Sequence, residues 1–227
     1  SGGDVQLHIT EHGPPEAPVL VLIAGTGAWG GTWVSNMPEL VAAGWRVVTI
    51  DLPPFGFSER PANRDYGRTA QAKRLLAGLR AVSPSPVVLL GHSYDGGPAA
   101  EAAMLEPAAV RHLILVDAAI GLSTAATPAC EEGGWLQSAI GWRQLRTALL
   151  ANTATQPLFS AMLLKQFVAR KAAVTDARTA LYLPPLKVQG SSAALGDWAY
   201  QFATSCEPNR SRTVQGFNNL KPPLTLL

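Results

Sequence analysis

The sequence has few of the residues that build cross-linked or metal-bound proteins. It contains two cysteines and four histidines in 227 residues. Neither Cys130 nor Cys206 has a second cysteine or a histidine at metal-ligand spacing, which excludes a zinc site of the usual kind and a disulfide framework. Two buried free thiols are the simplest interpretation. A disulfide between them, which would indicate an oxidising compartment, is left open.

Charged residues and long apolar runs are also scarce. Asp, Glu, Lys and Arg make up 15% of the chain, and the net charge is +2. Without a run of basic residues or a basic face with interleaved aromatics, nothing indicates nucleic-acid binding. No apolar run has the length of a membrane span, and no segment has a signal-peptide pattern. We therefore expect a small apolar molecule as the partner, with no nucleic acid and no membrane.

The rest of the composition is that of a globular protein. Hydrophobic residues account for 47% of the chain, enough for one substantial core with or without a lid. We expect a soluble, cytoplasmic protein. The chain begins Ser1-Gly2-Gly3 without a methionine, which leaves the earlier removal of a targeting segment open. The substrate and the oligomeric state, a homo-oligomer included, are left open as well.

Strands and helices alternate along the first half of the chain. Val5, Leu7 and Ile9 alternate with polar residues, which predicts an edge strand with His8 and His12 on its solvent side. Further on, apolar runs alternate with segments of helical spacing, the runs at 19–23, 46–50, 87–90 and 110–116 and the helices at 38–43, 65–82 and 99–105. This succession predicts an α/β fold with a mostly parallel central sheet flanked by helices. Ligands of such sheets bind beyond the carboxyl ends of the strands.

The alternation stops after residue 120. Wide apolar faces at 135–150 and 158–168 indicate helices, and Pro157 suits a first helical turn. We predict a core domain at 1–120, a helical cap at 121–201, and a return to the core at 202–227 that ends within another buried strand. Three tryptophans are candidates for substrate contact under the cap, although packing is the commoner role for each: Trp29, Trp135 and Trp142.

One segment has the pattern of a nucleophile. The apolar residues 87–90 lead into Gly91-His-Ser-Tyr-Asp-Gly-Gly97 and then into an alanine-rich helix. A serine on a tight strand-to-helix turn is exposed above the sheet, and the first amides of the helix form an anion site. Ser93 is therefore the candidate nucleophile. Asp95 stands where a small residue is usual: it would repel an oxyanion if it turned inward, and would gain from the helix dipole if it faced water.

Four segments together resemble the alpha/beta-hydrolase superfamily, in the branch with a helical cap. They are the elbow at Ser93, the Ala24-Gly25-Thr26-Gly27 loop, the turn at 51–58, and the Leu113-Ile-Leu-Val-Asp117 strand. The resemblance implies Ser93 as the nucleophile and the amides of Thr26 and Tyr94 as the oxyanion hole. It implies no metal and no organic cofactor. The family usually has His-Gly where this chain has Ala24-Gly25.

The rest of the family's catalytic triad has no counterpart here. The resemblance places a carboxylate after the strand that begins at Pro223 and a histidine one strand later, and the 227 residues contain neither position. Some relatives place the acid where Asp117 stands, although an aspartate there is commonly structural. We interpret the chain as a hydrolase whose C-terminal strands are absent from the sequence given. A ligand-binding relative without catalysis, and a site completed by a second chain, are the alternatives.

The function that follows is that of a serine hydrolase. It would cleave an ester or a similarly activated carbonyl of a small apolar substrate through an acyl-enzyme on Ser93. A carbon–carbon bond hydrolase or a cofactor-free haloperoxidase would use the same serine frame. A dehalogenase or an epoxide hydrolase of this fold would have an aspartate at position 93, so the serine argues against both.

Overall fold

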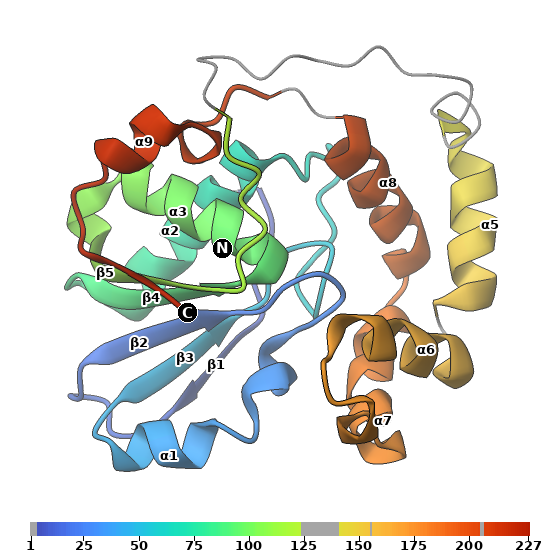
Figure 1. Ribbon diagram of the computed structural model, residues 1–227, viewed down its shortest axis with the longest axis horizontal. Helices are drawn as coiled ribbons and strands as arrows, with labels where there is room; N and C mark the ends of the chain where they lie inside the picture. Colours follow the sequence, from blue (N-terminus) through green and yellow to red (C-terminus); the bar gives the residue numbers. More distant parts are fainter. Residues whose placement is uncertain (1–3, 124–140, 155, 205–206) are drawn as a thin grey trace.

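The computed structural model describes residues 4–123, 141–154, 156–204 and 207–227, and its centre is a six-stranded sheet (Figure 1). The strand order is β1-β3-β2-β4-β5-β6. Every neighbouring pair is parallel except β1 and β3. The bounds are β1 Ile9–His12, β2 Val19–Ile23, β3 Arg46–Ile50, β4 Val87–His92, β5 Val110–Val116 and β6 Leu224–Leu226. The expected mostly parallel α/β sheet is thereby confirmed.

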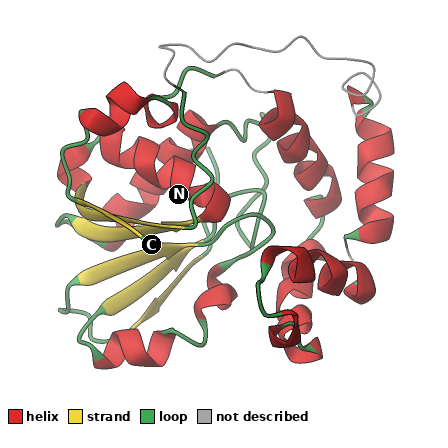
Figure 2. Cartoon of the chain, in the orientation of Figure 1, coloured by secondary structure: helices red, strands yellow, loops and turns green. Residues whose placement is uncertain are grey.

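Helices cover the two faces of the sheet unequally. The helix α1 (Met37–Ala42) lies on one face, and α2 (Arg68–Val82), α3 (Gly96–Leu105) and α9 (Val214–Asn218) lie on the other (Figure 2). Strands covered on both sides need apolar residues at successive positions, which explains the continuous runs in β2 and β3. The larger core lies between the sheet and the α2–α3 pair, where Val21, Ile23, Leu75 and Leu89 are fully buried.

Four helices stand beside the carboxyl edge of the sheet. They are α5 (Arg143–Thr153), α6 (Pro157–Phe167), α7 (Asp176–Leu186) and α8 (Ser191–Thr204). In Figure 1, α8 lies between α5 and the core, and α6 and α7 lie next to each other below them. We call these four helices the cap. They lie in the part of the chain where a helical insertion is predicted, and the domain limits at 120 and 201 stay a prediction.

The last strand differs from its expected environment. Leu224–Leu226 forms β6, but it pairs with β5 alone and Leu226 is 70% exposed. The prediction of a buried strand is wrong here because β6 lies at the edge of the sheet. The predicted roles of Cys130, Trp135 and Cys206 fall outside the described residues. Within the described ranges, no helix combines the length and the apolar character needed to cross a bilayer.

Candidate active site

The turn at Ser93 has the geometry of a nucleophile elbow. The strand β4 ends at His92, a single 3₁₀ turn covers Ser93–Asp95, and α3 begins at the next residue. Ser93 has a φ of 51°, a region that residues other than glycine rarely occupy. A Cβ atom on Gly91 would lie 2.7 Å from the Cβ of Ala99, so the helix turns back directly onto the strand. The strand, turn and helix predicted from the sequence are confirmed.

The glycine-rich loop after β2 packs against Ser93 through bare backbone. A Cβ atom on Gly25 would lie 2.6 Å from the Cβ of Ser93 and 3.1 Å from its Oγ. Thr26, the next residue, is therefore close to the serine, and Tyr94 follows the serine directly in the chain. The two amides expected to bind an oxyanion lie on either side of Ser93, and their role stays a prediction.

An apolar cavity of about 240 Å³ opens at Thr26 and Gly27. Phe55 lines it from the core, and the cap closes it from the other side. The cap residues are mostly apolar: Leu150, Ala154, Ser160, Leu163, Leu164, Phe167, Tyr182, Leu186, Leu195, Trp198 and Ala199. The loop beside Ser93 thus forms one end of a pocket that suits an apolar molecule.

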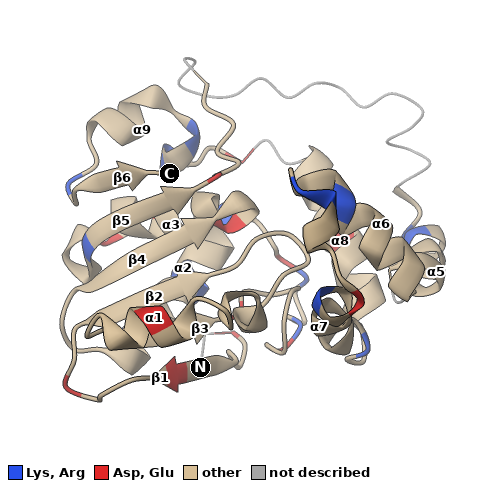
Figure 3. Cartoon of the chain, turned by 60° about the horizontal axis from the view of Figure 1, so that its bottom comes forward, with Lys and Arg blue, Asp and Glu red and all other residues tan. Residues whose placement is uncertain are grey.

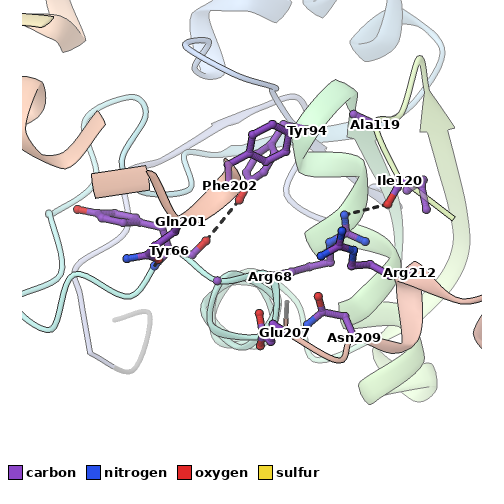
Figure 4. Close-up of a pocket in the computed structure, with 12 residues that line it drawn as sticks. Tyr66, Arg68, Tyr94, Ala119, Ile120, Gln201, Phe202, Glu207, Asn209 and Arg212 are labelled. Atoms are coloured by element: carbon purple, nitrogen blue, oxygen red, sulfur yellow. Dashed lines mark hydrogen bonds between the residues drawn. The ribbon is translucent and has the colours of Figure 1, made fainter. Parts of the chain in front are cut away.

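A second cavity, of about 270 Å³, is lined by Tyr94 and Ala119 next to the elbow (Figure 4). The Ala119 amide donates to the Ser93 carbonyl at 2.9 Å. Rings from both cavities meet in an edge-to-face contact, with 5.1 Å between the centroids of Tyr94 and Trp198. Thr26 thus borders the apolar cavity, and Tyr94, the residue after Ser93, borders a more polar one.

The Arg68 side chain connects segments that line the polar cavity. Its guanidinium donates to the Ile120 carbonyl at 3.0 Å and to the Ser211 carbonyl at 3.2 Å, which joins α2 to the segment after β5 (Figure 4). Burial, and the neighbouring charge of Arg212, lower the pKa of Arg68. Burial also raises the pKa of Tyr94 to about 12, so its hydroxyl keeps its proton and cannot serve as a base for Ser93.

All four histidines of the chain are described, and none of them hydrogen-bonds Ser93. The His92 ring contacts the Trp33 ring edge-to-face, and burial lowers its pKa. The Nε2 atom of His112 lies 2.8 Å from the Oγ1 of Thr225. His8 and His12 belong to the β1 segment, three strands from β4 and therefore about 14 Å away in the sheet. The described residues contain no histidine placed to take the serine proton.

Asp117 ends β5 close to the elbow. It is exposed, has a φ of 45°, and its amide donates to the carbonyl of Leu227 at 3.0 Å. No hydrogen bond or ion pair of its carboxylate occurs in the described part of the chain. A role as catalytic acid stays a prediction without a partner histidine to support it.

The Asp51 carboxylate accepts hydrogen bonds from amides of two loops near the site. It holds its own turn and a second loop: Oδ2 accepts from the Phe57 amide at 3.0 Å, and Oδ1 accepts from the Gly30 amide at 2.7 Å. The expectation that His8 faces solvent is wrong, because its Nδ1 lies 3.0 Å from Asp51 Oδ2 and its side chain is 34% exposed. Alternation within one strand does not reveal a partner 43 residues away.

The His8–Asp51 pair predicts a pH-dependent stability. The hydrogen bond to Asp51 raises the pKa of His8 above the usual value. The stabilisation is therefore complete below the ordinary histidine pKa and is lost as the pH rises through the raised one. Because the His8 side chain is 34% exposed and solvent screens the pair, we expect His8→Gln to cost about 0.5 kcal/mol near pH 5 and almost nothing near pH 9. Urea unfolding at the two pH values measures the difference; His12→Gln is the control, and an equal loss at both values would contradict the pairing.

Asp95 is the largest departure from the expected surroundings of the elbow. It is 2% exposed, and its Oδ1 has no hydrogen-bond partner. Burial, together with the charge of Asp51, raises its pKa well above the usual value. The water-facing alternative is therefore wrong. The carboxyl group is turned inward, where burial favours its neutral form and so opposes the charge that would repel an oxyanion.

The tryptophans expected to contact substrate have other surroundings. Trp29 donates from Nε1 to the Leu181 carbonyl at 2.9 Å and so ties its loop to α7. Trp142 precedes α5 and is 64% exposed. Neither lines the apolar cavity, which leaves substrate contact by either without support. Trp198 and Phe55, which do line it, were missed; only the apolar spacing of α8 pointed toward Trp198.

Comparison with known proteins places this geometry in a family. A model described as "alpha/beta hydrolase fold" matches residues 18–216. The chain is 36% identical over 123 residues to a 2-hydroxymuconate semialdehyde hydrolase of Pseudomonas sp. (strain CF600), covering 52% of this chain and 41% of the relative. It is 30% identical over 118 residues to a magnesium-chelatase 30 kDa subunit of Rhodobacter capsulatus, covering 52% and 40%.

Solved structures agree with the fold. A meta-cleavage product hydrolase from Pseudomonas fluorescens IP01 superposes with a TM-score of 0.72 at 18% identity, covering 100% of this chain and 76% of that one. The chain spans about two fifths of the length of the two curated relatives, 41% and 40%. The family match over residues 18–216 nevertheless decides the assignment: the chain belongs to the alpha/beta-hydrolase family.

Proposed function

We propose that this chain carries the nucleophile and the substrate pocket of a serine hydrolase. Its substrate would be an ester or a similarly activated carbonyl with a small apolar group. One observation carries the proposal: Ser93 stands at a φ of 51° on the strand-to-helix turn, and the bare backbone of Gly25 presses on it beside an apolar cavity.

The proposed reaction begins with attack of Ser93 Oγ on the substrate carbonyl. The amides of Thr26 and Tyr94 would stabilise the negative charge that develops on the carbonyl oxygen. Collapse of the tetrahedral intermediate expels the leaving group and forms an acyl-enzyme, which water then hydrolyses. The apolar cavity of about 240 Å³ would hold the acyl group. Cleavage of a carbon–carbon bond would use the same serine, and one relative is named a 2-hydroxymuconate semialdehyde hydrolase.

Proton transfer is the step that the described residues do not support. A serine hydroxyl is a weak nucleophile until a base removes its proton, and no histidine of this chain hydrogen-bonds Ser93. We propose that efficient turnover needs a base from outside these 227 residues. The chain by itself would then bind substrate and polarise its carbonyl without activating the nucleophile.

This proposal predicts slow hydrolysis of nitrophenyl butyrate by the chain alone. An oxyanion hole and a binding pocket without a complete triad accelerate hydrolysis by about 10³- to 10⁴-fold over water. We expect Ser93→Ala to change that residual rate by less than about threefold, since the hydroxyl is not activated. Release of nitrophenolate measures both rates. Rapid turnover that Ser93→Ala abolishes would show that a base is present after all.

A non-catalytic binding protein on the same fold is the second candidate. The absence of a histidine contact to Ser93 favours it, and one relative is named for a subunit of magnesium chelatase rather than for a hydrolase. Residual hydrolysis separates the two functions, because a hydrolase without its base keeps the acceleration that an oxyanion hole provides. Hydrolysis of nitrophenyl butyrate above the rate in water supports the hydrolase, and so would a covalent fluorophosphonate adduct on Ser93, which would show an activated serine despite the missing histidine. Binding of the ester without hydrolysis above the rate in water supports the binding protein.

A further inference from the structure

The cap helix α6 is apolar on almost every side and yet hardly buried. Ser160 is its single buried residue. On the side away from the pocket, Leu158 is 85% exposed and Met162, one turn later, is 50% exposed. A helix that is hydrophobic all round is normally covered by protein or lipid. Exposed apolar surface of this kind marks an interaction site.

The neighbouring helix α5 adds a second apolar stripe. Trp142, Leu145 and Leu149 follow one another at helical spacing and are 64%, 42% and 57% exposed. Its opposite side packs on α8, where Arg146 and Arg143 hold the buried Asp197. In Figure 1, α5 and α6 both lie at the outer end of the cap, away from the sheet. The outer surface of the cap therefore exposes two apolar stripes, one on α5 and one on α6.

The charged residues of the cap are mostly basic. Between residues 141 and 204 the sequence has seven Lys or Arg and two Asp or Glu, whereas the whole chain has 18 and 16. One of the two acids, Asp197, is buried in its pairs with Arg143 and Arg146. Basic positions recur on the cap helices in Figure 3. Lys165 follows Met162 on the outer side of α6, and Arg170 and Lys171 lie exposed just beyond its end.

We propose that the outer surface of the cap docks on an anionic lipid surface. Leu158 and Met162 would enter the boundary between headgroups and acyl chains, while Lys165, Arg170 and Lys171 contact the anionic headgroups. Charge complementarity selects this partner, because a cap with seven basic and two acidic residues attracts anionic lipid. The sequence-based expectation of no membrane came from the lack of a spanning segment, and it does not bear on surface docking.

The apolar cavity and the docking surface lie on different sides of α6. Leu163 and Phe167 of α6 line that cavity, and yet Phe167 is 80% exposed. Leu158 and Met162 lie on the opposite side of the helix, so docking through them does not by itself open a route from the lipid into the cavity. The docking itself does not depend on whether Ser93 is a nucleophile.

Co-sedimentation of the 227-residue chain with vesicles tests the docking. One set of vesicles contains equal parts of phosphatidylcholine and phosphatidylglycerol, and the other contains phosphatidylcholine alone. We expect the chain to sediment with the first set, to be released by salt, and to stay in solution with the second. Replacing both Leu158 and Met162 by serine is expected to weaken binding about tenfold. Both residues are exposed, so circular dichroism should show that the fold is unchanged.

Matched controls make each part of the surface testable. Val34→Ser removes an apolar side chain that is 57% exposed on the core, and it should leave vesicle binding unchanged. Lys165→Gln should weaken binding about fivefold, and Lys73→Gln on α2 should not. Equal binding to both kinds of vesicle, equal effects of the cap and control variants, or no binding would each overturn the proposal. So would a dimer in light scattering that the serine variant dissociates, because the surface would then join two copies of the chain.

Discussion

Replacing Gly25 by alanine is expected to destabilise the chain by about 3 kcal/mol and to deform the elbow. The added Cβ would lie 2.6 Å from the Cβ of Ser93 and 3.1 Å from both the His92 carbonyl and Ser93 Oγ. All three atoms belong to His92 and Ser93, where the strand enters the turn. Because Ser93 already stands in a strained backbone region, it cannot yield without loss of the turn. Urea unfolding measures the lost stability.

Gly27→Ala is the matched control in the same loop. Gly27 has a φ of +69°, but no atom lies within 4 Å of the position that its Cβ would take. The change should therefore cost only the strain of a left-handed alanine, about 1 kcal/mol. A difference between the two variants measures the close approach of the loop to Ser93. If both variants lost the same stability, the packing of Gly25 on the serine would be wrong.

Residual esterase activity gives a second measurement on the same pair of variants. The amide of Thr26 can donate to an oxyanion only while Gly25 keeps the loop against the elbow. We expect Gly25→Ala to lower the residual hydrolysis of nitrophenyl butyrate by about tenfold, less than the roughly 10²- to 10³-fold that full loss of one oxyanion donor causes. Gly27→Ala should keep most of the rate. An unchanged rate in Gly25→Ala would exclude Thr26 from the oxyanion hole.

The elbow was predictable from sequence because local chemistry determines it. An apolar strand, a serine, flanking glycines and an alanine-rich helix allow few other arrangements, and Val87–His92 and Gly96–Leu105 lie where expected. The same holds for the turn around Asp51, whose carboxylate accepts from amides a few residues away. Patterns within about ten residues of one another contain enough information for such elements.

The surroundings of single polar side chains were not predictable. His8 pairs with Asp51 across the sheet, and its strand pattern gives no sign of the pairing. Leu226 belongs to a strand pattern that reads as buried, yet nothing in that pattern says that β6 lies at the edge. Burial and partner choice depend on packing between distant segments. A sequence pattern predicts which face of a helix or strand is apolar. It does not predict which residues pack against that face.

Asp95 offers the sharpest test of such packing, because removing its charge should stabilise the chain. Its carboxyl group is fully buried, and its Oδ1 has no partner. The raised pKa means that folding opposes ionisation. Compared with a neutral residue, Asp95 therefore costs no stability below the ordinary aspartate pKa. It lowers the free energy of unfolding as the pH rises toward the raised pKa. We expect Asp95→Asn to increase the free energy of unfolding by about 2 kcal/mol near pH 8, and by much less near pH 4.

Asp117→Asn separates this effect from a general change of charge near the elbow. Asp117 is exposed, and its φ of 45° is one that asparagine tolerates well. We expect it to change stability by less than about 0.5 kcal/mol at either pH. If Asp95→Asn followed the same pH dependence as the unmodified chain, the carboxyl group would be hydrated and not buried behind the turn. A gain confined to the higher pH would instead show that the fold carries an acid group, two residues after Ser93, that folding keeps uncharged.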